Sequence, residues 1–108
     1  TPVGEANTLY AAFADGSSIQ RRDGHATMHG LYDFPRGDLT PQGRALRSTV
    51  VLREYDCDGR RVRLLSSIDF SGPMGQGEPV LVAAIPGRWE AVLAEGIDAA
   101  FWNAACAR

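Results

Sequence analysis

The sequence contains no lysine, and all eleven of its basic residues are arginines. It also has no apolar run close to the roughly 20 residues that a membrane-spanning helix needs, so we expect no membrane span in this chain. A phosphate-binding loop requires a lysine after its glycines. The glycine-rich segment 72–77 is followed by none, and it therefore predicts a mobile loop rather than a nucleotide site.

Histidine is scarce as well, and the two present do not predict a metal site. His25 and His29 are four residues apart, which on a helix would place them on one face. The surrounding alternation predicts a strand, on which they would lie about 13 Å apart, so we expect two solvent-facing side chains. Segment 56–59 lacks the further carboxylates of a calcium loop and is typical of a turn. We expect no metal and no cofactor.

No set of side chains predicts an enzyme. A serine hydrolase needs a nucleophile placed with a histidine and a carboxylate, and neither Ser17 nor Ser71 lies in a Gly-x-Ser-x-Gly motif. A hydrolase remains a hypothesis that would require a Ser or Cys within hydrogen-bonding reach of a His. We expect a protein that is not an enzyme.

Length and charge set further bounds. A chain of 108 residues has the usual size of one domain, so we expect a single domain over residues 1–108. The hydrophobic fraction of 44% and the charged fraction of 22% are typical of globular proteins. The net charge of -2 gives no overall attraction for nucleic acid, so we expect no nucleic-acid partner.

The two cysteines, Cys57 and Cys106, leave two interpretations open. They do not form a C-x-x-C redox motif, and no histidine-rich set accompanies them for zinc. A structural disulfide is the simplest interpretation, and it would imply an oxidising compartment. Two buried free thiols are the alternative. The chain begins at Thr1 without a hydrophobic leader, as a processed secreted protein or a shortened expression form would.

Alternating hydrophobicity predicts an antiparallel sheet. We expect strands at residues 7–14, 19–22, 25–34, 45–57, 60–70, 80–85 and 89–93. The pairs Asp23-Gly24 and Asp58-Gly59 favour tight turns between strands, whereas segments 35–43 and 71–79, rich in Gly and Pro, predict loops. In residues 97–106 the apolar period becomes that of a helix. This order predicts an α+β fold in which a C-terminal helix closes the sheet.

The same patterns predict which side chains are buried. In strand 25–34 the bulkier face consists of Ala26, Met28, Gly30, Tyr32 and Phe34. In strand 60–70 the residues Val62, Leu64, Ser66, Ile68 and Phe70 alternate with a more polar set. The continuous apolar run 49–52 predicts a central strand covered on both faces, and the two tryptophans, Trp89 and Trp102, are expected to anchor the core.

Arg60, Arg61 and Arg63 cluster beside Cys57 and form the candidate binding surface. With Arg53 and Arg47 across the hairpin, they would make a basic patch able to hold an acidic partner. Carboxylates at positions 54, 56 and 58 lie close enough to neutralise it, so a salt-bridged sheet face is the alternative.

Several short motifs, in order, resemble one bacterial family, the surface-adhesin protein E family. They are Asp15-Gly16-Ser17-Ser18-Ile19 with Asp23-Gly24, Glu54-Tyr55-Asp56-Cys57, Arg63-Leu64-Leu65, the loop through Gly75 and Gly77, Trp89-Glu90-Ala91-Val92, and the tail from Ile97 through Phe101-Trp102 to Cys106. The resemblance implies an antiparallel sheet of about six strands with a C-terminal helix tied to it by a disulfide. Cys57 and Cys106 match the two bonding positions.

The resemblance also implies location and function. It implies secretion into the periplasm or onto the outer-membrane surface of a Gram-negative bacterium, commonly as a lipoprotein. It implies a non-enzymatic domain that binds host extracellular proteins, and an open sheet edge suggests a homodimer. The alternative is a periplasmic, envelope-associated domain that binds a small molecule or an envelope protein, with the apolar sheet face or loop 71–79 forming the pocket.

Overall fold

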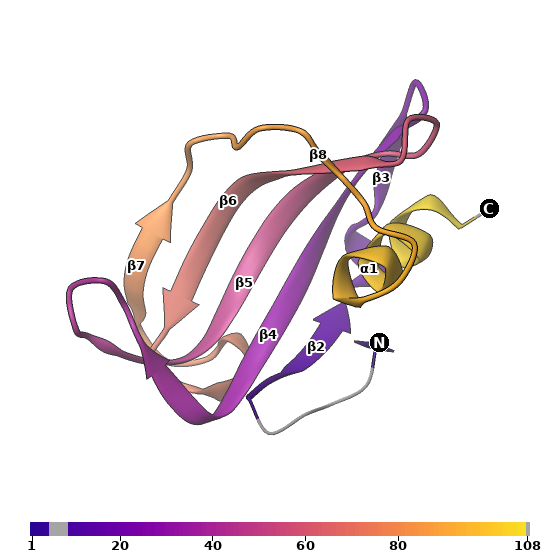
Figure 1. Cartoon of the computed structure of the whole chain (residues 1–108). Coiled ribbons are helices and arrows are strands. Elements are labelled where there is room, and N and C mark those ends of the chain that lie inside the picture. The colour runs from indigo at the N-terminus through magenta and orange to yellow at the C-terminus, as the bar shows by residue number, and fades with distance from the viewer. Residues whose placement is uncertain (5–8, 108) are drawn as a thin grey trace.

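The computed structural model describes residues 1–4 and 9–107. They form an antiparallel sheet whose main path runs β1-β2-β4-β5-β6-β7, with β3 paired to β4 and β8 to β6 (Figure 1). The strands are β1 (Pro2–Val3), β2 (Ala11–Ala14), β3 (Gln20–Arg22), β4 (His25–Leu39), β5 (Ala45–Asp56), β6 (Arg61–Phe70), β7 (Pro79–Ala83) and β8 (Glu90–Ala91). The predicted antiparallel sheet of about six strands is confirmed.

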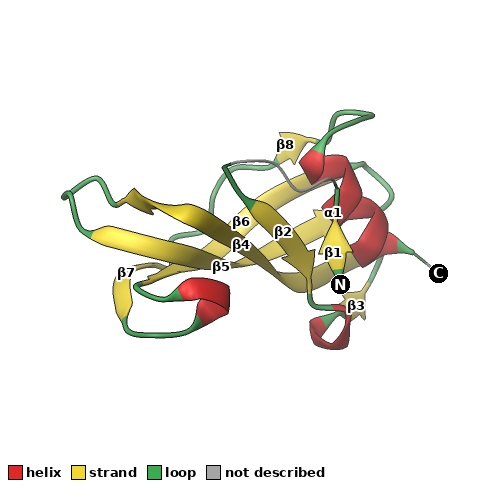
Figure 2. Ribbon diagram, turned by 90° about the horizontal axis from the view of Figure 1, so that it is seen from below, coloured by secondary structure: helices red, strands yellow, loops and turns green. Residues whose placement is uncertain are grey.

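The two faces of the sheet differ in what covers them. The helix α1 (Ile97–Cys106) packs on one face, which we call the helix face. The short 3₁₀ helices η1 (Gly16–Ser18) and η2 (Pro73–Gly75) lie on the opposite side, which we call the open face (Figure 2). Because directly paired residues of neighbouring strands point to the same face, the register assigns each strand residue to one of them.

The hydrophobic core lies between α1 and the helix face. Its buried members are Ala12, Ala14, Ala26, Met28, Tyr55, Val62, Val92, Ala99, Phe101 and Ala105. Gly30 lies directly under the helix, since a Cβ at this position would be 2.8 Å from Cε1 of Phe101. The missing side chain at Gly30 therefore lets the helix approach β4 closely.

A disulfide ties the end of α1 to the sheet. Cys57 follows β5 directly, and its sulfur is bonded to that of Cys106, with the two Cα atoms 5.5 Å apart. The predicted disulfide is confirmed, and the alternative of two free thiols is wrong. Half-buried Trp102 adds a second link, because its Nε1–H donates to the carbonyl oxygen of Asp56 at 3.1 Å.

A third link holds the last turn of α1. The guanidinium of Arg21 donates hydrogen bonds to the carbonyl oxygens of Ala105 and Ala107. These carbonyls have no partner within the helix, and a cation beside them also suits the negative end of the helix dipole. The predicted helix over residues 97–106 is confirmed at both ends.

Two predicted turns are confirmed in their local chemistry. Asp23 and Gly24 both have positive φ, 52° and 77°, as a type I′ turn requires. After β5 the chain turns over residues 57–60, where the Asp56 carboxylate accepts from the backbone N–H of Gly59 at 2.8 Å. The positive φ of this turn lies at Arg60 rather than at Gly59.

The predicted loop 35–43 is wrong for its first half, since β4 continues to Leu39. The pairing of β4 with β5 shifts between Asp33 and Asp38, where β4 bulges. Gly37 supplies the positive φ of 72° that this irregularity uses. The breakers that predicted a loop therefore form a bulge, after which pairing resumes.

The predicted alternation in β6 is also wrong beyond its midpoint. Leu64 pairs with Arg53, but the residue before Arg53 in β5, Leu52, pairs with Ser66. Leu65 is therefore an extra residue without a partner position in β5. Ser66, Ile68 and Phe70 therefore point to the open face, opposite to Val62 and Leu64. The predicted strands 80–85 and 89–93 are also shorter than expected, as β7 and β8. Residues 7 and 8 of the predicted first strand lie outside the described residues.

Candidate functional site

A charged cluster occupies the open face near the turn after β5. The register places His25 of β4 opposite Asp56 of β5, and Asp56 opposite Arg61 of β6. One step further along the sheet, Glu54 lies opposite Arg63. Five titratable side chains from three adjacent strands are thereby brought to one face.

These side chains are ion-paired. Nδ1 of His25 lies 2.8 Å from Oε2 of Glu54, and its Nε2 lies 3.8 Å from Oδ1 of Asp56. Each arginine pairs with the opposite carboxylate: Nη2 of Arg61 lies 2.8 Å from Asp56, and Nη2 of Arg63 lies 2.6 Å from Glu54. The charges of Arg61 and Arg63 are therefore neutralised by carboxylates on the same face of the sheet.

Trp89 lies on the same cluster. The guanidinium carbons of Arg61 and Arg63 are 5.1 and 4.9 Å from its ring centroid, and the His25 ring meets it edge to face at 5.4 Å. Cation–π contacts of this kind hold the segment before β8 against the sheet. The prediction that Trp89 anchors the core is wrong, whereas Trp102 packs against the core as predicted.

The cluster lowers the pKa values of its two carboxyl groups. The hydrogen bond from His25, followed by that from Arg63, holds the pKa of Glu54 below its ordinary value. The backbone N–H of Gly59, followed by Arg61, holds the pKa of Asp56 below its ordinary value. Both groups are therefore stabilised as carboxylates in the folded chain.

The structure separates the three arginines that the sequence groups together. Arg61 and Arg63 share the open face, but Arg60 lies in the turn with a φ of 52°. Its guanidinium stacks on Trp102 at 4.6 Å and donates to the carbonyl oxygen of Leu93. Arg53, expected near them, points to the helix face, where it donates to the Tyr32 hydroxyl at 2.9 Å.

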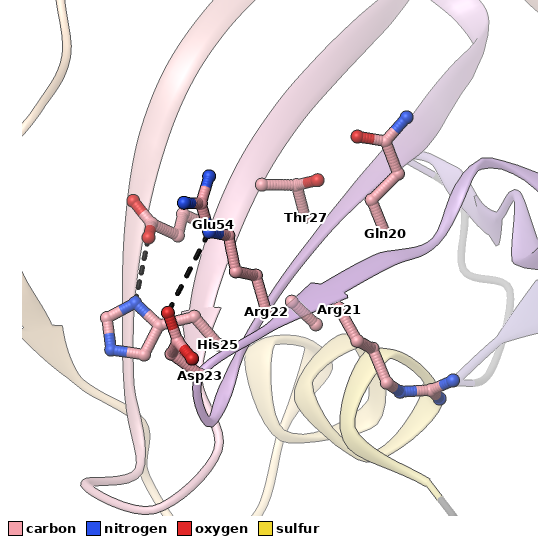
Figure 3. A pocket seen from close by; sticks show the side chains of 8 residues that line it. Gln20, Arg21, Arg22, Asp23, His25, Thr27 and Glu54 are labelled. Atoms are coloured by element: carbon pink, nitrogen blue, oxygen red, sulfur yellow. Dashed lines mark hydrogen bonds and ion pairs between the residues drawn. The ribbon is translucent and has the colours of Figure 1, made fainter.

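An open polar groove lies beside the charged cluster (Figure 3). Gln20 and Arg22 of β3 line one side, and the register places Thr27 between Gln20 and Glu54. In Figure 3 the Arg22 and Asp23 side chains face one another across the tip of the β3–β4 hairpin. The prediction of a solvent-facing His25 is wrong in part, because this side chain is half-buried, while His29 is exposed.

A row of apolar side chains crosses the open face further along the sheet. Successive pairings join Phe13 of β2, Leu31 of β4, Val50 of β5, Ile68 of β6 and Val82 of β7. We call these five residues the apolar row. Sequence reasoning missed it because each strand contributes one member, and the pairing register alone brings them together.

The β2 end of the apolar row forms the floor of a second groove. Phe13, Leu31 and Val50 line it, and η1 and η2 contribute its walls through Ser17 and Met74. Asp15 and His29 line its polar end. We call this depression the η1–η2 groove.

Within the described residues, no group of three or more His, Cys, Asp or Glu side chains is placed to hold a metal ion. In the same part of the chain, no helix has the length and apolar character needed to cross a membrane.

The sequence matches the family model described as "Surface-adhesin protein E" over residues 1–107. This chain belongs to the surface-adhesin protein E family. Among curated proteins, no sequence matches it.

Solved structures of Haemophilus influenzae protein E have the same fold as this chain. Crystal form II of Haemophilus influenzae protein E has a TM-score of 0.72 and 16% identity, over 99% of this chain and 94% of that one. A second structure of Haemophilus influenzae protein E has a TM-score of 0.70 and 16% identity, over 99% and 90%. The structure of protein E from non-typeable Haemophilus influenzae has a TM-score of 0.61 and 18% identity, over 92% of this chain and 67% of that one.

Family membership supports a coarse assignment. The chain is an adhesin-like surface protein of a non-enzymatic family. Such a family is extracytoplasmic and exposed on the surface of Gram-negative bacteria. The resemblance drawn from its sequence motifs is confirmed.

Proposed function

We propose that this chain is a binding domain displayed outside the cytoplasm that recognises host extracellular proteins of the matrix or serum. The observation that carries the proposal is the match to the surface-adhesin protein E model over residues 1–107. The Cys57–Cys106 disulfide supports an oxidising compartment. We place the protein in the periplasm or on the outer-membrane surface, as a lipoprotein, and metabolic labelling of the full-length protein with radioactive palmitate tests the anchor.

Binding to immobilised host proteins tests the adhesive function. Surface plasmon resonance on vitronectin and laminin is expected to show saturable binding of the oxidised chain, and albumin serves as the control surface. A response on albumin as large as that on the matrix proteins would contradict specific adhesion. No response on any matrix or serum protein would leave only the fold.

Arg60, Arg61 and Arg63 are part of this proposal as contacts for acidic groups of the partner. The side chains of Arg61 and Arg63 are 48% and 33% exposed, so each guanidinium still presents N–H groups to solvent. A partner carboxylate would bind there in addition to Asp56 and Glu54. Replacing Arg61 with Gln is expected to slow association with an acidic partner, whereas replacing the distant, exposed Arg36 is expected to leave the rate unchanged.

We also propose that the protein pairs with itself through an edge of the sheet. β7 is an edge strand with an exposed Val82, and such edges favour pairing with a second chain. Light scattering coupled to size exclusion measures the mass directly, and a monomer at the highest attainable concentration would remove this part of the proposal.

The second candidate is an envelope-associated domain that binds a small molecule or an envelope protein. The η1–η2 groove is the observation that favours it, since an apolar floor meets polar groups there. The groove is open to solvent rather than enclosed, which suits a protein segment better than a small ligand. If an envelope metabolite raised the melting temperature of the chain and no matrix protein bound to it, the second candidate function would be favoured over adhesion.

A further inference from the structure

The η1–η2 groove leaves the β2 end of the apolar row accessible. Phe13, Leu31 and Val50 are half-buried on its floor, on the face of the sheet that α1 does not cover. Further along the row the backbone of η2 lies on the sheet, since a Cβ at Gly75 would be 3.3 Å from Cγ2 of Val50. At the β2 end of the row, the accessible apolar surface therefore forms a bounded depression between η1 and η2.

Met74, on the wall of this groove, has a backbone conformation that residues other than glycine and asparagine rarely adopt. Its φ and ψ are 56° and 36°, in the left-handed region, which costs a residue with a Cβ roughly 1–2 kcal/mol. The N–H of Met74 donates to Oδ1 of Asp33 at 2.9 Å, which holds the turn in place. The structure thus keeps a flexible apolar side chain, 47% exposed, at the groove against a local cost.

The polar end of the groove contains one carboxylate beside the Thr1 amino group and the His29 ring. Among the described residues that line it, Asp15 is the one carboxylate and none is an arginine. Oδ1 of Asp15 accepts from both the N–H and the hydroxyl of Ser17, whose hydrogen bonds hold the pKa of this carboxyl below its ordinary value. The terminal ammonium of Thr1, which also lines the groove, donates to the carbonyl oxygen of Ala14. Oδ2 of Asp15 has no hydrogen bond or ion pair to the described residues and remains available to a cation.

We propose that the η1–η2 groove receives one apolar side chain of an extended segment of a partner protein, and that an adjacent lysine or arginine of that segment pairs with Asp15. This inference rests on the proposed function and names where the partner docks. An apolar floor beside a lone carboxylate complements an apolar–basic pair of residues. Anionic lipid does not fit, because Asp15 would repel its headgroup.

A protein segment fits the shape of the surface. The groove is open to solvent at its mouth but bounded by η1 and η2, since the backbone of η2 lies against Val50. It therefore has room for one side chain of a longer segment, while the rest of that segment passes over the mouth. Loop-walled grooves of this kind use one or two buried anchors to orient a longer segment.

Blocked dipeptides test the recognition chemistry directly. We expect acetyl-Leu-Arg-amide, titrated into the ¹⁵N-labelled oxidised chain, to shift the backbone amide signals of Ser17, Leu31 and Gly75 in a saturable way. Acetyl-Leu-Glu-amide is expected to bind about fivefold more weakly, the usual limit for one exposed ion pair. Acetyl-Ser-Arg-amide is expected to bind roughly tenfold more weakly, because it lacks the apolar side chain. Equal shifts with all three peptides would overturn the proposal.

Two variants locate the site without removing a structural element. Met74→Asn keeps a residue that tolerates the left-handed conformation and removes the apolar wall. Asp15→Asn keeps the oxygen that accepts from Ser17 and removes the charge. Each is expected to weaken acetyl-Leu-Arg-amide binding several-fold while the chain stays folded, as an unchanged circular dichroism spectrum at the titration temperature would show. Ile85→Asn, at an apolar side chain 87% exposed and outside the groove, is the matched control and is expected to change nothing.

The same variants separate this inference from the proposed function. If the wild-type chain binds a matrix protein and both groove variants bind it equally well, the docking site is wrong and the adhesive function stands. If no matrix protein binds, the function fails, and the dipeptide titration still decides the groove. If the same amide signals shift when the concentration of the chain alone is raised, the occupant is a second copy, and the proposal is overturned.

Discussion

Gly30 is the residue at which β4 and α1 come closest, and it offers the sharpest single-residue test of the fold. A Cβ there would be 2.8 Å from the fully buried ring of Phe101 and 3.3 Å from Cγ2 of Val51. We expect Gly30→Ala to lower the free energy of unfolding by about 1–3 kcal/mol, as overpacking of a core does. Thermal unfolding followed by circular dichroism measures the loss as a melting temperature lower by roughly 4 °C or more.

Gly16→Ala is the control for this substitution. No atom lies within 4 Å of a Cβ at Gly16, and its φ is not in the left-handed region. Its melting temperature is expected to stay within about a degree or two of the wild type. Equal losses at both positions would mean that the close approach of helix and sheet is not what Gly30 permits.

The carboxyl groups of Glu54 and Asp56 predict how stability depends on acid. Their pKa values in the folded chain lie below the ordinary values of 4.5 and 3.8. The unfolded chain therefore binds more protons, and stability rises with pH in this range. The contribution is complete above the ordinary values and is lost as the pH falls through the lowered ones.

We expect Glu54→Gln to be less stable than the wild type at pH 7 and nearly as stable at pH 3. Urea unfolding at several pH values measures this convergence, and Glu95→Gln, at an exposed carboxyl outside the cluster, is the control. Curves that stay parallel down to pH 3 would show that the pair with His25 and Arg63 contributes no stability.

At the scale of elements, Arg21 joins two that are far apart in sequence, because its guanidinium in β3 holds the last carbonyls of α1. We expect Arg21→Gln to cost about 1 kcal/mol, the usual size of a cation at a helix C-terminus with a charged hydrogen bond. Hydrogen exchange of the amides in the last turn of α1 is expected to speed up. Arg22→Gln, whose side chain is 92% exposed, should leave exchange unchanged.

The elements themselves were predictable where a local pattern decided them. The period of residues 97–106 gave α1, and Asp23-Gly24 gave the first hairpin, because both depend on neighbouring residues alone. The bulge in β4 and the extra Leu65 in β6 were not predictable, since they exist only relative to β5. A one-residue shift moves every later side chain to the other face.

The candidate site was only partly predictable, because the pairing of neighbouring strands decides which side chains meet there. Arg61 and Arg63 alternate along one strand, so their common face follows from the sequence. Their partners Glu54 and Asp56 are set by the hairpin turn, which brings these carboxylates opposite the arginines. The apolar row and the η1–η2 groove depend on four strand pairings and two loops, which no single segment encodes.

For the whole molecule, the disulfide is expected to be the largest single stabilising contribution. Cys57 and Cys106 are 49 positions apart, and closing a loop of that length is worth about 4 kcal/mol in the chain-entropy model. We expect the double variant Cys57→Ser with Cys106→Ser to melt many degrees lower, and the fluorescence of Trp102 to shift to the red as α1 loosens.

Reduction of the wild-type chain provides an independent check. A thiol reductant should lower the melting temperature of the wild type to that of the double variant and leave the variant unchanged. A wild-type melt that does not respond to reductant, with free thiols shown by mass spectrometry, would mean that Trp102 and Arg21 hold the helix without the covalent link.

The Cys57–Cys106 disulfide and the core lie on the helix face, and this affects how the sequence of such a protein can diverge. The residues that hold the fold lie mainly between α1 and one side of the sheet, whereas most open-face residues contact solvent or a loop. Substitutions on the open face therefore remove little buried area and cost little stability. Descendants of one ancestral chain can accumulate changes there and acquire new specificities while the opposite face preserves the scaffold.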